Sequence, residues 1–262
     1  MHIALTRAVP QSLERCELTH LARSPIDVAL AARQHAAYED ALRAVGCTVV
    51  RLPPEPDRPD SVFVEDTAVV LDEVAVITRP GAPSRRGETA STAAALRAWR
   101  PLVAIEDPGT IDGGDVLVAR RAVFVGLGAR SNADGLRQLA RHLAPFGYDV
   151  RGVEVTGCLH LKSAATLLSA SSVLVNPAFV DPRVFAPLEA VPVAPEEPSA
   201  ANALLVGGDL IYSRAYPRTC GILERRGARV ALVDLGELAK AEGALTCCSL
   251  VFDGQPGSGL RA

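Results

Sequence analysis

The sequence predicts an α/β fold in which five ββαβ units close into a ring, with the strands inside and the helices outside. Strand-like and helix-like segments recur in one order, and comparable hairpin positions follow at intervals of roughly 40 to 55 residues, the range of repeat and propeller architectures. These positions are Val62, Val116, Ala164, Ala203 and Leu245. Only the N-terminal strand and first helix can complete the last unit, and this closure removes exposed sheet edges. An open α/β sheet with helices on both faces is the alternative, and it would not require the termini to meet.

The first elements come from the N-terminal third of the chain. A strand-like segment at 2–5 leads through a polar stretch to 27–45, where apolar side chains recur at helical spacing as far as Gly46. This pattern is typical of an amphipathic helix and its end. The segments that follow have the β-branched residues of strands or the periodicity of a helix, and we expect strands at 48–52, 61–70 and 74–78 and a helix at 88–99.

The same order then recurs along the chain, although the units share negligible sequence identity and the prediction rests on pattern. The second round predicts strands at 102–105, 116–118 and 122–125 and a helix at 132–143. The third predicts strands at 148–155, 159–168 and 172–175 and a weaker helix at 183–188. The fourth predicts strands at 191–193, 202–206 and 209–212 and a helix at 218–225, and the fifth begins at 229–233 and runs into a strand at 244–252.

Composition limits the classes of function. With 262 residues, 48% of them hydrophobic, the chain can bury a large core, and we treat 1–262 as one domain. A net charge of −3 gives no basic excess for nucleic acid, and no run approaches the ~20 apolar residues of a membrane span. The N-terminus lacks the pattern of a signal peptide, so we expect a cytoplasmic protein. Six cysteines without a CxxC pair indicate free thiols rather than disulfides or a zinc site.

Two adjacent cysteines, Cys247 and Cys248, lie in the strand-like segment near the end of the chain. Successive side chains of a strand point to opposite faces, so one thiol is expected to face the core and the other the opposite side, where it could react. The alternative is that both are small buried hydrophobic residues, since free cysteine is among the most buried residue types.

Acidic residues and a histidine occur at comparable positions of the other units. Asp60 precedes a predicted strand that contains Glu65 and Asp66, and paired carboxylates in an apolar strand are costly without partners. Asp112 and Asp115 flank a Gly-Gly turn, and His160 lies in a predicted core strand. Each of these residues also has a non-catalytic interpretation. Aspartates beside glycines, Asp115 especially, are common in turns, and a histidine in a core strand is more often a hydrogen-bonded structural residue than a base. A thiol nucleophile, however, needs a neighbouring imidazole, and the imidazole needs an acceptor to fix its tautomer.

Five motifs in the same order resemble the dimethylarginine dimethylaminohydrolase family of the pentein, or guanidino-modifying, superfamily. Each motif alone is weak, but together they cover nearly the whole chain. They are Phe63-Val64-Glu65-Asp66, Thr78-Arg79-Pro80-Gly81-Ala82-Pro83-Ser84-Arg85-Arg86, Asp112-Gly113-Gly114-Asp115, Leu159-His160-Leu161-Lys162-Ser163 and Leu245-Thr246-Cys247-Cys248-Ser249. The resemblance implies a five-bladed ββαβ ring, which agrees with the repeat pattern.

The resemblance also implies the roles of individual residues. Cys247 matches the nucleophile, His160 the general acid and base, and Asp112 the acid that orients the imidazole. Substrate-binding positions are matched by Leu18, Asp60, Glu65, Asp66, Arg85, Arg130 and Ala241. Leu18 and Ala241 are loop-borne, weaker matches, and Ala241 stands where a bulkier residue is expected.

The implied activity is hydrolysis of Nω-methylated arginines to citrulline and an alkylamine, through a covalent thiouronium on Cys247. Carboxylates accept the forked N–H donors of a guanidinium, and Arg85 and Arg130 are expected to hold the α-carboxylate. No metal or organic cofactor is required. We expect a small-molecule guanidino substrate and neither nucleic-acid nor membrane partners, and a homodimer is left open.

Two rival functions remain. An arginine deiminase or an amidinotransferase of the same superfamily is the first, but the deiminase pattern has an acid two residues after the histidine, where this chain has Lys162. The second is a non-catalytic pentein scaffold, which would have no reason to retain Cys247, His160 and Asp112 together. Because Lys162 stands where the deiminase pattern has an acid, one end of the substrate guanidinium is not bound by a carboxylate there and can carry methyl groups.

Overall fold

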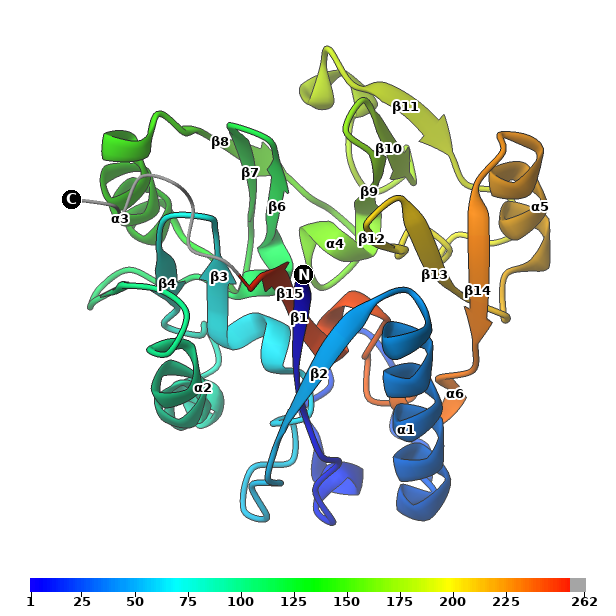
Figure 1. Cartoon of the computed structure of the whole chain (residues 1–262), viewed down its shortest axis with the longest axis horizontal. Coiled ribbons are helices and arrows are strands. Elements are labelled where there is room, and N and C mark those ends of the chain that lie inside the picture. Colours follow the sequence, from blue (N-terminus) through cyan, green and yellow to red (C-terminus); the bar gives the residue numbers. More distant parts are fainter. Residues whose placement is uncertain (255–262) are drawn as a thin grey trace.

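The structure, a computed structural model, describes residues 1–254. Its strands form five separate three-stranded sheets. In each sheet the central strand pairs antiparallel with one neighbour and parallel with the other. The sheets stand around a common axis, and the helices lie outside them (Figure 1). The predicted ring of five ββαβ units is confirmed, and the chain does not form one open sheet.

Each sheet has an inner, a central and an outer strand. In that order, the strands of the five sheets are β15 (Ser249–Asp253), β1 (His2–Arg7) and β2 (Cys47–Leu52); β3 (Ala68–Val70), β4 (Ala75–Ile77) and β5 (Leu102–Ala104); β6 (Val116–Ala119), β7 (Ala122–Leu127) and β8 (Asp149–Glu154); β9 (Ala165–Ser169), β10 (Ser172–Val175) and β11 (Glu189–Pro192); and β12 (Leu204–Val206), β13 (Asp209–Ser213) and β14 (Arg229–Val233).

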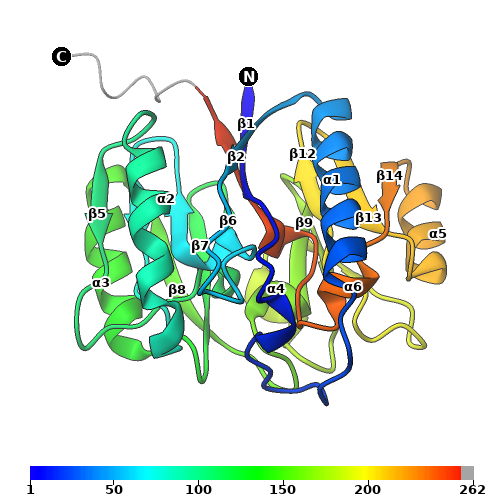
Figure 2. The same ribbon diagram turned by 90° about the horizontal axis from the view of Figure 1, so that it is seen from below.

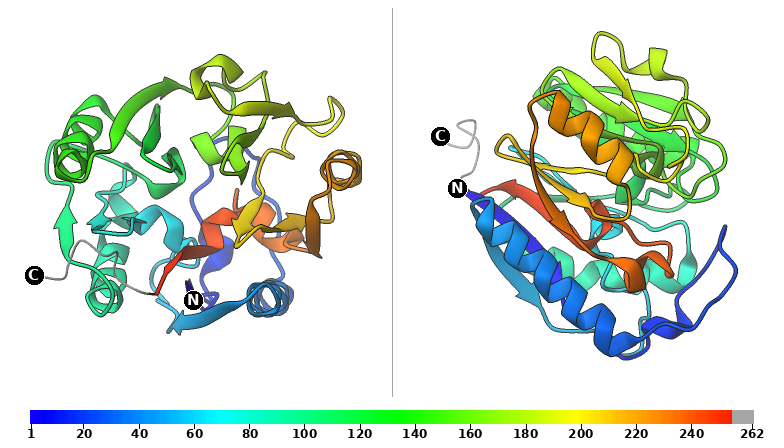
Figure 3. Two further views of the ribbon diagram at one scale, coloured as in Figure 1. Left: turned by 45° about the horizontal axis from the view of Figure 1, so that its top comes forward. Right: turned by 90° about the vertical axis from the view of Figure 1, so that its right-hand side faces the viewer.

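A helix or helical turn joins the central strand to the outer strand of every sheet, and these segments surround the ring (Figure 3). They are α1 (Val28–Ala44), α2 (Thr89–Leu96), α3 (Ala133–Leu143), η6 (Pro182–Phe185) and α5 (Pro217–Arg225). In α1 the predicted amphipathic pattern buries Ala31, His35, Tyr38 and Leu42 against the sheets. The weak helix predicted at 183–188 is the short 3-10 turn η6.

Shorter helical segments lie in the connections: η1 (Leu13–Arg15), η3 (Pro83–Glu88), η5 (Ala144–Phe146) and α6 (Gly236–Ala239). None of the helices within residues 1–254 is long and apolar enough to span a bilayer.

The two ends of the described chain close the ring. β15 pairs antiparallel with β1, from His2 opposite Asp253 to Thr6 opposite Ser249. The amide of Gly254 also donates a hydrogen bond to the carbonyl of Met1 at 2.8 Å. Figure 2 shows these two strands side by side. The C-terminal and N-terminal segments therefore form one blade, as the repeat pattern predicts.

One prediction about the inner strands is wrong. The sequence predicts strands over 61–70, 159–168 and 244–252, whereas in each of these the strand is short and a tight helical turn precedes it. These turns are η2 (Val64–Thr67), α4 (Leu161–Ala164) and η7 (Thr246–Cys248), and η4 (Gly113–Asp115) takes the same place before β6. Each turn has only three or four residues, which is too short for a helical periodicity to distinguish it from the strand that follows.

Candidate active site

Seven predicted site residues, contributed by helical turns and loops, meet at one small cavity. Its wall includes Asp60, Asp66, Arg85, Arg130, His160, Ala241 and Cys247. The volume is about 20 Å³, which is room for about one water molecule and not for a substrate. Asp112 is fully buried and bonded to His160, whereas Leu18 and Glu65 are not part of this wall.

His160 is oriented by Asp112. The ring Nε2 lies 3.0 Å from Asp112 Oδ2, and the other carboxylate oxygen of Asp112 accepts the amide N–H of Gly81 at 2.8 Å. Asp112 is therefore fixed from both sides. The Nδ1 atom of His160 is left on the side of Asp66, whose Oδ1 lies 3.9 Å away. The sequence-based pairing of His160 with Asp112 agrees with this geometry, although His160 precedes the turn α4 rather than lying in a strand.

Gly114 is a site residue that the sequence did not single out. Its amide donates to Asp66 Oδ1 at 2.9 Å. A Cβ atom at this position would lie 2.7 Å from His160 Nδ1 and 2.9 Å from Asp66 Oδ1, closer than real Cβ contacts. The absence of a side chain at Gly114 therefore allows the His160 ring and Asp66 to approach the backbone closely, a role in addition to forming the turn. An alignment of relatives could have revealed it; one sequence could not.

Three carboxylates determine the protonation of His160. Burial alone would lower its pKa, but Asp66, Asp115 and Asp112 raise the pKa of His160 to about 10. The imidazole is therefore a cation at neutral pH. Asp115 itself accepts the amide of Leu161 at 3.0 Å and the hydroxyl of Ser131 at 2.7 Å, so it binds backbone as its position in the turn predicts.

The two cysteines have different surroundings, as predicted, but the predicted cause is wrong. They do not alternate on a strand, because both lie at the end of the 3-10 turn η7. Cys247 lines the cavity, whereas Cys248 is fully buried and its thiol donates to the carbonyl of Ala244 at 3.4 Å. Burial and the charges of Glu65 and Asp66 raise the pKa of Cys247, so its sulfur is a thiol in the empty site. All six cysteines are unpaired, as predicted.

Arg85 is buried and not solvated. Its guanidinium bonds to the carboxylates of Asp66 and Glu88 and to the carbonyls of Asp60 and Phe63. Burial would raise the pKa of Asp66, but the cations of His160 and Arg85 hold it well below the usual range. Asp66 is therefore an ionised acceptor on the cavity wall. Arg85 places that acceptor, and most of its own donors are already used.

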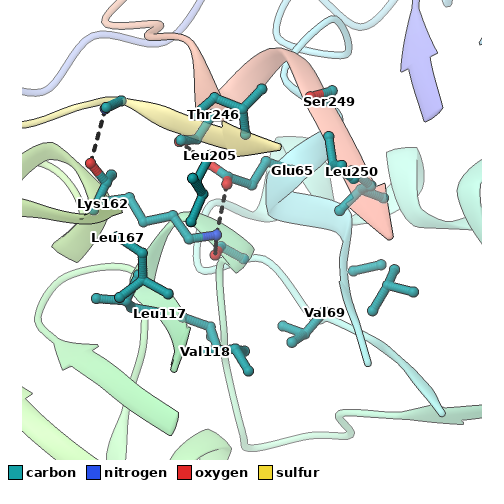
Figure 4. A pocket seen from close by; sticks show the side chains of 18 residues that line it. Glu65, Val69, Leu117, Val118, Lys162, Leu167, Leu205, Thr246, Ser249 and Leu250 are labelled. Carbon is teal, nitrogen blue, oxygen red and sulfur yellow. Dashed lines mark hydrogen bonds and ion pairs between the residues drawn. The ribbon is translucent and has the colours of Figure 1, made fainter. Parts of the chain in front are cut away.

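Glu65 faces the opposite side of the ring. Its Oε1 accepts the ammonium of Lys162 at 2.7 Å and its Oε2 accepts the hydroxyl of Thr246 at 2.9 Å. Figure 4 shows Lys162 directed at Glu65 among the aliphatic side chains of the inner strands. These strands line an axial cavity of about 250 Å³ that contains neither Cys247 nor His160. The larger cavity is therefore not where the reactive groups meet, and Lys162 adds no carboxylate to the smaller one.

A segment near the N-terminus lies beside the Cys247 cavity, whose wall includes Glu17 and Glu242. The Glu242 carboxylate accepts the consecutive amide N–H groups of Thr19, His20 and Leu21, the shortest bond being 2.5 Å. Glu242 has a φ of 59°, in the left-handed region. Arg130 adds a second tie, because its Nη2 donates to Thr19 Oγ1 at 3.1 Å. Residues 17–21, called the cover segment below, contain Leu18.

Asp66, Asp112 and His160 have oxygen and nitrogen atoms within 4.8 Å of one another, a spacing that a metal ion could bridge. Each of these groups already has a partner, since Arg85 bonds Asp66 and Asp112 bonds His160 Nε2. The donor set therefore fits a charged imidazole between carboxylates better than a metal centre.

Comparisons with known proteins show the family to which the chain belongs. The family model described as arginine deiminase matches residues 54–197. The chain is 42% identical to the N(G),N(G)-dimethylarginine dimethylaminohydrolase of Streptomyces coelicolor, over 94% of this chain and 95% of the relative. It is 37% identical to the protein of the same name from Pseudomonas aeruginosa, over 86% of this chain and 90% of the relative.

Solved structures of related proteins have the same fold. A dimethylarginine dimethylaminohydrolase variant in an adduct with S-methyl-L-thiocitrulline has a TM-score of 0.91 and 35% identity, with 96% of this chain and 100% of that chain covered. A Cys-to-Ser mutant of the Pseudomonas aeruginosa dimethylarginine dimethylaminohydrolase, complexed with citrulline, has a TM-score of 0.89 and 34% identity, with 95% of this chain and 98% of that chain covered. With the ring, the site geometry and these relatives, the chain belongs to the dimethylarginine dimethylaminohydrolase family.

Proposed function

We propose that this protein hydrolyses Nω-methylated arginines, namely monomethylarginine and asymmetric dimethylarginine, to citrulline and methylamine or dimethylamine. The observation that carries the proposal is the placement of Cys247 and a protonated His160 on the wall of one cavity beside the ionised Asp66. A thiol, a proton donor and an anionic acceptor for a guanidinium are the groups that the reaction needs. Relatives that carry the enzyme's name and relative structures with citrulline or a thiocitrulline adduct support it.

The first half-reaction forms the covalent intermediate. The bound guanidinium cation favours the thiolate, so the Cys247 proton leaves to solvent as the substrate binds. The sulfur then attacks the guanidinium carbon, the bond from that carbon to the methylated nitrogen breaks, and His160 donates its Nδ1 proton to the departing amine. A thiouronium on Cys247 and a neutral His160 result.

The second half-reaction uses water. Neutral His160 takes a proton from a water molecule, whose oxygen attacks the thiouronium carbon. The carbon–sulfur bond then breaks, and the remaining proton of the added hydroxyl passes to the leaving sulfur. This returns the Cys247 thiol and leaves citrulline. His160 ends protonated, ready for the next amine. Asp112 keeps Nε2 bonded throughout, so Nδ1 is the atom that exchanges protons.

The proposed substrate contacts divide between the two ends of the amino acid. Asp66 accepts guanidinium N–H groups, and Arg130 binds the α-carboxylate. Arg85 serves the site through Asp66, to which it is bonded. Asp60 and the backbone of Leu18 lie toward the amino-acid end, where the amide of Glu17 donates to Asp60 Oδ2 at 3.2 Å. Glu65 acts through Thr246 and Lys162, and Ala241 leaves space in the wall.

Citrulline formation from monomethylarginine, asymmetric dimethylarginine and arginine at equal concentration tests the proposal. We expect both methylated compounds to be turned over well ahead of arginine, because Lys162 bonds Glu65 and brings no second carboxylate to the guanidinium. Arginine as the best substrate would indicate a deiminase. No turnover of any of the three would indicate a non-catalytic scaffold. A single domain over 1–262, a cytoplasmic location and a homodimer stay predictions from the sequence.

A further inference from the structure

Glu17 places a carboxylate at the amino-acid end of the cavity that no step of the proposed reaction uses. It lies at the start of the cover segment and lines the cavity together with Asp60 and Arg130. Its carboxylate accepts the hydroxyl of Ser84, and its backbone N–H donates to Asp60 Oδ2 at 3.2 Å. Two acids and one arginine therefore face the same small space.

The contact between Glu17 and Arg130 is loose. Arg130 Nη1 lies 3.8 Å from Glu17 Oε2, about 1 Å beyond a charge-assisted hydrogen bond. The other guanidinium nitrogen of Arg130 bonds Thr19 Oγ1 at 3.1 Å. The other arginine of the described cavity wall, Arg85, is bonded to Asp66 and Glu88. Of these two arginines, Arg130 is therefore the one with unused N–H donors for an incoming carboxylate.

We propose that Glu17 determines specificity for a free α-amino group. In the empty site Glu17 neutralises Arg130. When an amino acid enters, its α-carboxylate takes Arg130, and the released Glu17 carboxylate and Asp60 hold the α-ammonium. Arg130 exchanges Glu17 for the ligand carboxylate, and Glu17 exchanges Arg130 for the ligand ammonium. The zwitterion can therefore separate Glu17 from Arg130 without leaving either charge unpaired. This inference rests on the proposed substrate, a methylated arginine with a free amino-acid end.

The same geometry disfavours a ligand that has the carboxylate but no ammonium. Such a ligand would separate Arg130 from Glu17 and offer Glu17 no cation in return. The Glu17 carboxylate, whose side chain is 43% exposed, would then lie at the cavity wall close to the carboxylate of the ligand, and like charges so placed repel. Glu17 should thus strengthen binding of the amino acid and weaken binding of its deamino analogue.

Calorimetric titration of the Cys247→Ser protein tests this pair of opposite effects. The ligands are Nω-monomethyl-L-arginine and 5-(N′-methylguanidino)pentanoate, which differ only in the α-amino group. Adding Glu17→Gln keeps an acceptor for Ser84 and removes the charge. We expect it to weaken binding of the amino acid about tenfold, as for loss of one charge-assisted hydrogen bond, and to strengthen binding of the deamino compound. Glu14→Gln, an exposed acid on the preceding turn, is the matched control and should change neither.

If Glu17→Gln changed the affinity for both ligands in the same direction, Glu17 would only support the cover segment. If it changed neither affinity, Glu17 would have no role in binding. Either result overturns the inference. Turnover is scored separately with unmodified protein. Opposite changes in the two affinities without citrulline formation would support the role of Glu17 and reject the proposed reaction. Citrulline formation without opposite changes in affinity would reject only the role of Glu17.

Discussion

Replacing Asp112 by Asn should move the alkaline limit of activity toward neutral pH. His160 must carry a proton to release the amine, and its pKa of about 10 depends on the carboxylates of Asp66, Asp115 and Asp112, which outweigh the opposing effect of burial. The nearest contact is that of Asp112, at 3.0 Å from Nε2. An opposite charge at such range shifts a pKa by about 1–3 units, so the variant's limit should fall to about pH 7–9. Asn keeps an oxygen acceptor for Nε2 and removes the charge.

The assay is kcat/KM for citrulline formation from asymmetric dimethylarginine, measured from neutral to strongly alkaline pH, because this ratio reports the ionisations of the free enzyme. Asp181→Asn removes an exposed carboxylate paired with Arg183 and should leave the profile unchanged. An alkaline limb that stays near pH 10 in Asp112→Asn would refute the assignment of that limb to His160.

Three further variants test the supporting contacts. Gly114→Ala should lower kcat by about 10²-fold or more while the protein stays folded by circular dichroism, because the new Cβ displaces the His160 ring; unchanged kcat would contradict the packing. Lys162→Met should cost about 3 kcal/mol of unfolding free energy in urea, because it leaves buried Glu65 uncompensated, and adding Glu65→Leu should restore it; a fully stable single variant would contradict the pairing. Glu242→Gln should speed amide exchange at 19–21 about tenfold, and equal exchange rates would show that the carboxylate does not hold the cover segment.

Most of the ring was predictable because its signals are periodic. The helix at 132–143 and the strand pairing that closes the ring follow from apolar spacing and from the need to cover sheet edges. The turns that carry Glu65, Asp66 and Cys247 could not be separated from the strands that follow them, because each is short and largely buried. Periodicity needs several residues to distinguish two structures, and these turns have three or four.

The sequence allowed prediction of those site residues whose type the chemistry constrains. It did not allow prediction of contacts that depend on three-dimensional geometry. A thiol, an imidazole and an acid form a recognisable set, and the resemblance to a family assigns its members to Cys247, His160 and Asp112. The direction of Glu65 toward Lys162 depends on a turn 97 residues away in the chain, which no local pattern reveals. The close approach at Gly114 and the loose pairing of Glu17 with Arg130 likewise exist only in three dimensions.

The proposed reaction requires that Cys247 becomes covalently bonded to the substrate carbon during turnover. Mass spectrometry of protein quenched in acid while it consumes asymmetric dimethylarginine tests this requirement, with peptide mapping to locate the modified residue. We expect an amidino adduct on Cys247 that is absent in Cys247→Ser and present in Cys248→Ser, because only Cys247 reaches the cavity. An adduct on Cys248, or steady citrulline production by Cys247→Ser, would contradict the mechanism.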